Sequence, residues 1–171
     1  MSCDLRGASL VARAYAKINI GLEVLGRRPD GYHELRTILQ TIDLHDEIRF
    51  YPREQGIELS TTDPSIPHDA ANLAYVAARL FAERCESPPG IFIDLEKRIP
   101  PGMGLGGGSA DAAATLLALN RLWSADIEPA ELHEIAARIG MDVPFFLYGG
   151  TALAVGRGDE VYPLDLAPEL P

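Results

Sequence analysis

A glycine-rich segment is the strongest sign of chemistry in this sequence. It lies between a predicted strand that ends at Leu95 and a predicted helix that begins at Ala110, and it reads Pro100, Pro101, Gly102, Met103, Gly104, Leu105, Gly106, Gly107, Gly108, Ser109. Its many glycines let backbone N–H groups turn toward one point. The N-terminus of the helix adds free N–H groups and the positive end of its dipole. The segment therefore predicts an anion site, most naturally for phosphate.

The spacing of this segment differs from the better-known phosphate motifs. A Walker A loop requires Gly-Lys-Ser/Thr, whereas Gly107 is followed here by a further glycine. A Rossmann fingerprint requires G-x-G-x-x-G, and the glycines at 102, 104 and 106 do not follow it. The Ser109 hydroxyl could cap the helix, touch phosphate or ligate Mg²⁺. A flexible loop with a serine N-cap is the alternative interpretation.

A second candidate is a pair of polar residues on a predicted strand. Residues 18–25 alternate, and this pattern predicts a half-buried strand whose inner face carries Ile18, Ile20, Leu22 and Val24. Lys17 and Asn19 share the opposite face, so both could address one ligand. The alternative is that this opposite face is an ordinary polar side turned to solvent.

Two further segments hold residues suited to binding or proton transfer. Tyr32 and His33 follow a Pro-Asp-Gly turn, where an aromatic ring and an imidazole could recognise a planar base; a plain surface turn is the alternative. Asp142 lies between a helix end and an apolar run. A positioned carboxylate there could orient and deprotonate an attacking alcohol in phosphoryl transfer. Alternatively, Asp142 could cap the next turn of helix.

Length and composition limit the class of protein. The 171 residues suggest one domain, and the net charge of −10 gives no basic surface for nucleic acid. Residues 1–40 are the exception, with six basic and four acidic side chains. The apolar runs are far shorter than the ~20 residues of a membrane span, and the first residues lack the apolar core of a secretory signal. Cys3 and Cys85 are too few for a disulfide framework and have no metal-binding spacing. We therefore expect a cytoplasmic protein with a small-molecule partner, and neither a nucleic acid nor a membrane.

The remaining patterns predict the elements that must position these residues. Strands are expected at 36–42, 46–51, 56–60, 91–95, 151–155 and 161–164, and helices at 72–86, 110–123 and 129–139, the first capped by Asp69 or Asn72. Strands come in groups rather than alternating regularly with helices, which favours an α+β fold.

Taken together, these segments resemble one family. The stretches AKINIGLEVLGRRPDGYHEL, KRIPPGMGLGGGSADAAATLLALNRLW and GMDVPFFLYGGTALAVGRGD are similar to the kinases that phosphorylate 4-diphosphocytidyl-2-C-methyl-D-erythritol, in the GHMP kinase superfamily. The glycine loop indicates the superfamily, whereas the DGYH turn and the GMDVPFF segment point to this member. The resemblance covers about residues 12–165. It implies an α+β, ribosomal-protein-S5-domain-2-like fold, with a mixed sheet packed against helices.

The resemblance also implies roles for individual residues. Residues 100–110, from Pro100 to Ala110, would wrap the phosphates of ATP, the expected cosubstrate together with Mg²⁺, whose ligands are unknown. Asp142 would be the catalytic base, and Lys17 would keep it ionised and stabilise the transferred charge. The remaining residues would bind ligand: Asn19 the methylerythritol end, Tyr32 and His33 the cytosine, and Asn72 and Lys97 the adenosine.

The length of the chain departs from the family pattern. These kinases have a second, C-terminal domain, and residues 1–171 correspond to the N-terminal, ATP-binding domain. We therefore expect a kinase acting in the non-mevalonate pathway of isoprenoid synthesis. The alternatives are another GHMP small-molecule kinase, or a nucleotide-binding module without turnover. The oligomeric state is not predicted.

Overall fold

The computed structural model describes residues 9–165 as a six-stranded mixed sheet with four helices. The strands are β1 (Leu10–Arg27), β2 (His33–Arg53), β3 (Ile57–Thr61), β4 (Gly90–Glu96), β5 (Thr151–Gly156) and β6 (Glu160–Pro163). The helices are α1 (Leu73–Ala82), α2 (Gly107–Leu122), α3 (Pro129–Ile139) and α4 (Val143–Tyr148). None of the helices in this range is long and apolar enough to cross a membrane. The expected α+β class is confirmed.

Strand β2 organises the sheet. One of its edges pairs antiparallel with β1 along almost its whole length. Its other edge is shared, because residues 47–53 pair with β4 and residues 35–40 pair with β5. Strands β3 and β4 run parallel and are connected through α1. One long strand therefore spans both parts of the sheet, and the segments before and after the glycine loop are attached to it.

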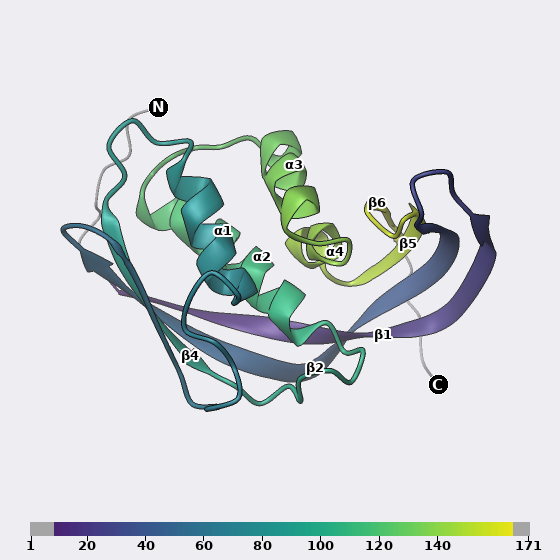
Figure 1. Ribbon diagram of the computed structural model, residues 1–171, viewed down its shortest axis with the longest axis horizontal. Helices are drawn as coiled ribbons and strands as arrows, with labels where there is room; N and C mark the ends of the chain where they lie inside the picture. The colour runs from purple at the N-terminus through teal and green to yellow at the C-terminus, as the bar shows by residue number, and fades with distance from the viewer. Residues whose placement is uncertain (1–8, 166–171) are drawn as a thin grey trace.

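The helices gather on one side of the sheet, and the core lies between these two layers (Figure 1). Phe50 and Ile93 of the sheet are fully buried, as is Leu116 of α2. Phe81 of α1 and Trp123, just after α2, meet edge to face with ring centroids 5.7 Å apart. Such apolar burial is the main driving force for folding, so it holds α2 and the loop before it against the sheet.

Local signals predict several element bounds correctly. Helix α3 starts at Pro129, where a missing N–H costs nothing, and ends before Gly140, as expected. Asn72 caps α1 by accepting a hydrogen bond from the backbone N–H of Ala74 at 2.9 Å. That helix ends at Ala82, four residues earlier than predicted.

Three predictions about elements are wrong. The two strands expected at 36–42 and 46–51 form the single strand β2, because β1 pairs with both of them on either side of a register shift between Tyr15 and Lys17, and the backbone stays extended between them. Helix α2 begins at Gly107, so the last residues of the predicted loop are helical. The short helix α4 follows Asp142, in an apolar run where a turn of helix was considered only as the alternative to a catalytic role for Asp142.

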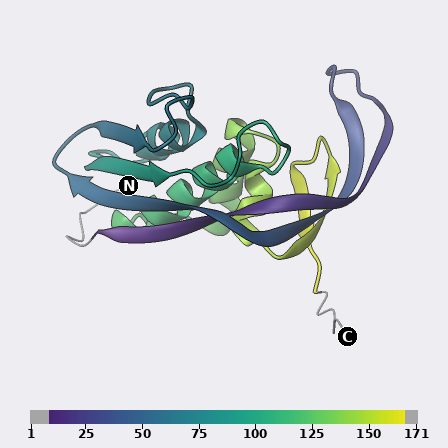
Figure 2. The ribbon, with the colours of Figure 1, turned by 90° about the horizontal axis from the view of Figure 1, so that it is seen from below.

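The predicted inner face of the first strand is also wrong. Beyond Lys17, β1 and its partner β2 form an arm that extends past the helices toward the end of the molecule that holds β5 and β6 (Figure 2). Ile18, Ile20, Leu22 and Val24 are 40–61% exposed there. Alternation identified a strand correctly, but within residues 9–165 no layer covers this face. The prediction about Cys3, and the absence of an apolar signal in the first residues, lie outside the described residues.

Candidate active site

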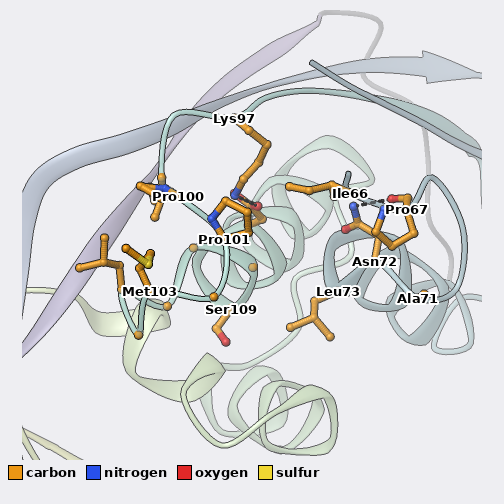
Figure 3. Close-up of a pocket in the computed structure, with 18 residues that line it drawn as sticks. Ile66, Pro67, Ala71, Asn72, Leu73, Lys97, Pro100, Pro101, Met103 and Ser109 are labelled. Atoms are coloured by element: carbon orange, nitrogen blue, oxygen red, sulfur yellow. Dashed lines mark hydrogen bonds and ion pairs between the residues drawn. The ribbon is translucent and has the colours of Figure 1, made fainter. Parts of the chain in front are cut away.

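The glycine loop lines a pocket of about 320 Å³. In Figure 3, Pro100, Pro101 and Met103 of the loop lie on one side, and Ile66, Pro67 and Asn72 lie on the other. All ten residues from Pro100 to Ser109, and also Lys97, contribute to the lining, whereas the buried Ala110 does not. The structure thus brings nearly all of the predicted ATP-binding residues around one concave space.

The end of the loop leads directly into the N-terminus of α2. Gly106 occupies the N-cap position with φ of 72°, a left-handed conformation that glycine adopts without strain. No side chain among the described residues caps this helix. Ser109 lies inside the first turn, so the alternative of a serine N-cap is wrong. The uncapped N–H groups and the helix dipole together favour an anion at this end of the pocket.

A buried charge cluster ties the two ends of the glycine loop together. The ammonium of Lys97, at the end of β4, contacts Asp111 of α2 at 2.7 Å and also pairs with Asp46 of β2. The second oxygen of Asp46 accepts hydrogen bonds from the backbone N–H groups of Arg98 and Ile99. The cluster therefore holds both the strand that enters the loop and the helix that leaves it. Sequence reasoning missed Asp46, which has no motif around it.

The charges in this cluster are unbalanced, since one lysine serves two carboxylates. Burial raises the pKa of the Asp111 carboxyl to about 7, although the neighbouring Lys97 acts to lower it. Burial also acts to lower the Lys97 pKa, but the two carboxylates outweigh that effect and the pKa is raised overall. One oxygen of Asp111 has no hydrogen-bond partner in the described part of the chain. Lys97 thus presents a paired ammonium to the pocket.

Lys17 and Asn19, the two polar residues predicted to share a face of β1, do contact each other. Lys17 is not turned to solvent, as the alternative interpretation had it. Lys17 is buried, and its ammonium donates a hydrogen bond to the Asn19 side chain at 2.8 Å. The Asn19 amide in turn donates to the Thr37 hydroxyl at 2.8 Å. The lysine is therefore held in place by an ordered polar chain that runs across both strands of the hairpin.

Asp142 completes this arrangement from the other end of the chain. Its carboxylate lies 3.3 Å from the Lys17 ammonium. Asp142 does occupy the N-cap position of α4, as the capping alternative expects. Its side chain makes no capping hydrogen bond, however, so capping does not account for its contact with Lys17. A lysine ammonium has three N–H donors, and these contacts employ two of them. The third remains available for a ligand oxygen.

The Lys17–Asp142 pair borders the glycine loop. The backbone N–H of Lys17 donates to the carbonyl of Leu105 at 3.0 Å. A Cβ added to Gly106 would come within 3.2 Å of the Lys17 side chain and 2.6 Å of Phe146, which follows Asp142 on α4. Glycine at 106 therefore permits the close approach of β1, α4 and the loop. A cation and a carboxylate stand beside the predicted phosphate site.

Tyr32 and His33 lie elsewhere. They are exposed at the tip of the β1–β2 arm and do not line the pocket. Residues 9–165 contain no group of three or more acidic, histidine or cysteine side chains placed to hold a metal ion. Magnesium that accompanies a nucleotide needs few protein ligands, because phosphates and waters supply most of them. The Ser109 hydroxyl fits that need, whereas Asp111 is buried and paired with Lys97.

The fold and this site together define a class of protein. Residues 72–150 match the family described as "GHMP kinases N terminal domain". The chain is also similar in structure to homoserine kinase from Cytophaga hutchinsonii, with a TM-score of 0.71 and 23% identity, over 96% of this chain and 54% of the other. That likeness concerns the fold alone. The fold is that of a GHMP kinase N-terminal domain, and residues 72–150 carry the sequence match to that family.

Within that class, two proteins with higher sequence identity share one name. A 4-diphosphocytidyl-2-C-methyl-D-erythritol kinase from Synechococcus sp. (strain JA-2-3B'a(2-13)) is 49% identical over 160 residues, which cover 94% of this chain and 51% of the relative. A crystal structure of 4-(cytidine 5'-diphospho)-2C-methyl-D-erythritol kinase matches with a TM-score of 0.79 and 44% identity, over 91% of this chain and 55% of the other. The chain thus spans about half the length of the relatives it matches.

Proposed function

We propose that this chain is the ATP-binding domain of a small-molecule kinase. The kinase transfers the γ-phosphoryl group of ATP to the 2-hydroxyl of 4-diphosphocytidyl-2-C-methyl-D-erythritol, a step of non-mevalonate isoprenoid precursor synthesis. The observation that carries the proposal is the Lys17–Asp142 ion pair, 3.3 Å long, beside a glycine loop that opens onto an uncapped helix N-terminus. The names of relatives at 46–49% identity support the choice of substrate.

In this proposal, each charged residue has one task in the transfer. Asp142 accepts the proton of the substrate's 2-hydroxyl, and the hydroxyl oxygen bonds to the γ-phosphorus. At the same time the bond between the γ-phosphorus and the β-phosphate oxygen breaks, and ADP leaves. Lys17 uses its remaining N–H to stabilise the charge on the transferred group. The loop and the α2 N-terminus hold the phosphates. Bound Mg²⁺ would neutralise phosphate charge, with Ser109 as its protein neighbour.

The other predicted residues bind the two ends of the ligands. Asn19, whose side chain touches Lys17, would hold the methylerythritol end. Tyr32 and His33 would recognise the cytosine at the arm tip. Asn72 and Lys97 line the pocket and would border the adenosine. Because the Asn72 side chain caps α1 and the Lys97 ammonium is paired, both would act mainly through shape and through their backbone groups.

The test is the release of ADP by the 171-residue chain with Mg-ATP, with and without the cytidylyl substrate. We expect release that depends on the substrate and is lost in Asp142→Asn, while ATP affinity stays nearly unchanged. Release that persists in the variant would remove the base role from Asp142. Release with a different sugar or alcohol alone would favour another GHMP kinase.

The pocket favours one further candidate. The glycine loop and the uncapped N-terminus of α2 form a phosphate site that does not depend on the Lys17–Asp142 pair, which fits a module that binds nucleotide without turnover. ATP binding by titration calorimetry, combined with no substrate-dependent ADP release, would support this binding-module alternative over the kinase.

A further inference from the structure

Two turns that are distant in the sequence meet at the tip of the β1–β2 arm. The guanidinium carbon of Arg157, between β5 and β6, lies 5.4 Å from the centre of the Tyr32 ring. The sheet register explains the meeting, because Leu35, just after the arm tip, pairs with Gly156. A guanidinium over the face of a tyrosine ring is a favourable cation–π contact.

The backbone around Arg157 is shaped to present this side chain. Gly156 and Gly158 have φ values of 68° and 97°, a region that strains other residues, and the N–H of Gly158 closes the turn onto the carbonyl of Val155 at 3.0 Å. The guanidinium also donates to Asp159 at 2.5 Å. The hydrogen bond to Asp159 and the glycine turn therefore hold the Arg157 side chain in place against the Tyr32 ring.

Tyr32 is restrained on its own side of the contact. Its backbone N–H donates to the Asp30 carboxylate at 3.1 Å, and its carbonyl accepts a hydrogen bond from the backbone N–H of Arg28 at 2.8 Å. The Arg28 side chain binds both Asp30 and Glu34. Despite these contacts Tyr32 is 49% exposed. Arg157 lies over the ring, and about half of the residue's surface is still open to a ligand.

We infer that Arg157 is a positioning residue, which holds the Tyr32 ring so that its open face stacks on a pyrimidine base. This inference rests on the proposed function, in which Tyr32 recognises cytosine. A ring that is ordered before binding loses less conformational freedom when the ligand arrives. At exposed sites a cation–π contact contributes about 0.5–1 kcal/mol, which corresponds to about a 2- to 5-fold change in affinity.

The experiment measures binding of cytidine 5′-diphosphate and of ADP to the 171-residue chain by titration calorimetry. Arg157→Ala should weaken cytidine diphosphate about 2- to 5-fold and leave ADP unchanged, whereas Arg157→Lys should retain most of the affinity. Combined with Tyr32→Ala, Arg157→Ala should have no further effect, because the contact it supplies is already gone. Arg36→Ala is the matched control, since Arg36 lies on the same arm and pairs with Glu23.

Each other outcome overturns the inference in a recognisable way. Unchanged cytidine diphosphate binding in Arg157→Ala would remove the role of Arg157 and leave the proposed function standing. Equal weakening of both nucleotides would indicate a general structural role. A further loss in the Tyr32→Ala background would mean that Arg157 touches the ligand directly. A wild-type chain that binds ADP and not cytidine diphosphate would overturn the cytidylyl substrate together with the inference.

Discussion

The ammonium of Lys17 lies 3.3 Å from the carboxylate of Asp142, and these two residues come from opposite ends of the described chain. The lysine is almost fully buried, whereas the Asp142 side chain is 41% exposed. The cation is thus supported by the protein, and the carboxylate is open to a ligand. This asymmetry suits a fixed electrostatic group beside a base that must reach a substrate hydroxyl.

Replacing the lysine tests this division of tasks. Lys17→Met should lower kcat in the ADP-release assay by about 10²-fold or more, as expected for removing a preorganised donor from the transition state. The KM for ATP should change much less. Arg13→Met, on the same strand, is the control and should leave both constants near the wild-type values. A rise in KM with an unchanged kcat would show that Lys17 serves ground-state binding instead.

The buried cluster predicts an unusual pH dependence. In the folded chain the pKa of Asp111 is raised to about 7, whereas an unfolded aspartate releases its proton near pH 4. Between these values the folded state binds more protons, so the contribution of Asp111 to the free energy of unfolding falls as the pH rises. Asp111→Asn should remove that fall. The free energy of unfolding of the variant, relative to that of the wild type, should therefore rise by about 2–4 kcal/mol from pH 4 to pH 8.

Urea denaturation at several pH values measures this difference. Asp63→Asn is a suitable control, because hydrogen bonds from Ser65 lower the pKa of this partly exposed carboxyl. Because its pKa is lowered rather than raised, its variant should keep the wild-type slope between pH 5 and 8. Parallel profiles for wild type and Asp111→Asn would contradict the raised pKa.

Two glycines of the loop should respond differently to alanine. Gly102 and Gly106 have nearly equal positive φ values, 74° and 72°. A Cβ at Gly102 meets nothing within 4 Å, whereas a Cβ at Gly106 meets Phe146 at 2.6 Å. Gly102→Ala should therefore cost about 1–2 kcal/mol for backbone strain alone. Gly106→Ala should cost about 1–3 kcal/mol more, because of the clash with Phe146. Thermal unfolding of the two variants measures both losses of stability. Equal costs would refute the close approach of α4.

The exposed face of the arm predicts tolerance to truncation. Leu22 is 56% exposed, whereas Leu116 of α2 is fully buried. Leu116→Ala should lower the free energy of unfolding by about 2–5 kcal/mol. Leu22→Ala should change it by about 0.5 kcal/mol or less. A large loss for Leu22→Ala in the 171-residue chain would mean that something covers this face in solution.

Features that depend only on neighbouring residues can be predicted from the amino-acid sequence. Local backbone preferences predict the glycine-rich loop between a strand and a helix and the bounds of α3 from Pro129 to Ile139, and they limit the cap of α1 to Asp69 or Asn72. The resemblance of whole segments, from the DGYH turn to GMDVPFF, indicated the family. Local signals suffice there because each concerns a few residues that are adjacent in the chain.

The contacts between distant side chains, and the faces that are buried, follow only from the way the elements pack. Periodicity placed Lys17 on a polar face, but only packing of β1 against the loop and α4 buries it beside Asp142. The same periodicity placed Ile20 inside, and the arm leaves it exposed. The pairing of β2 with β4 brings Lys97 beside Asp46, and no local sequence pattern predicts that pairing. Burial and pairing depend on the layers that lie opposite, and those come from distant parts of the chain.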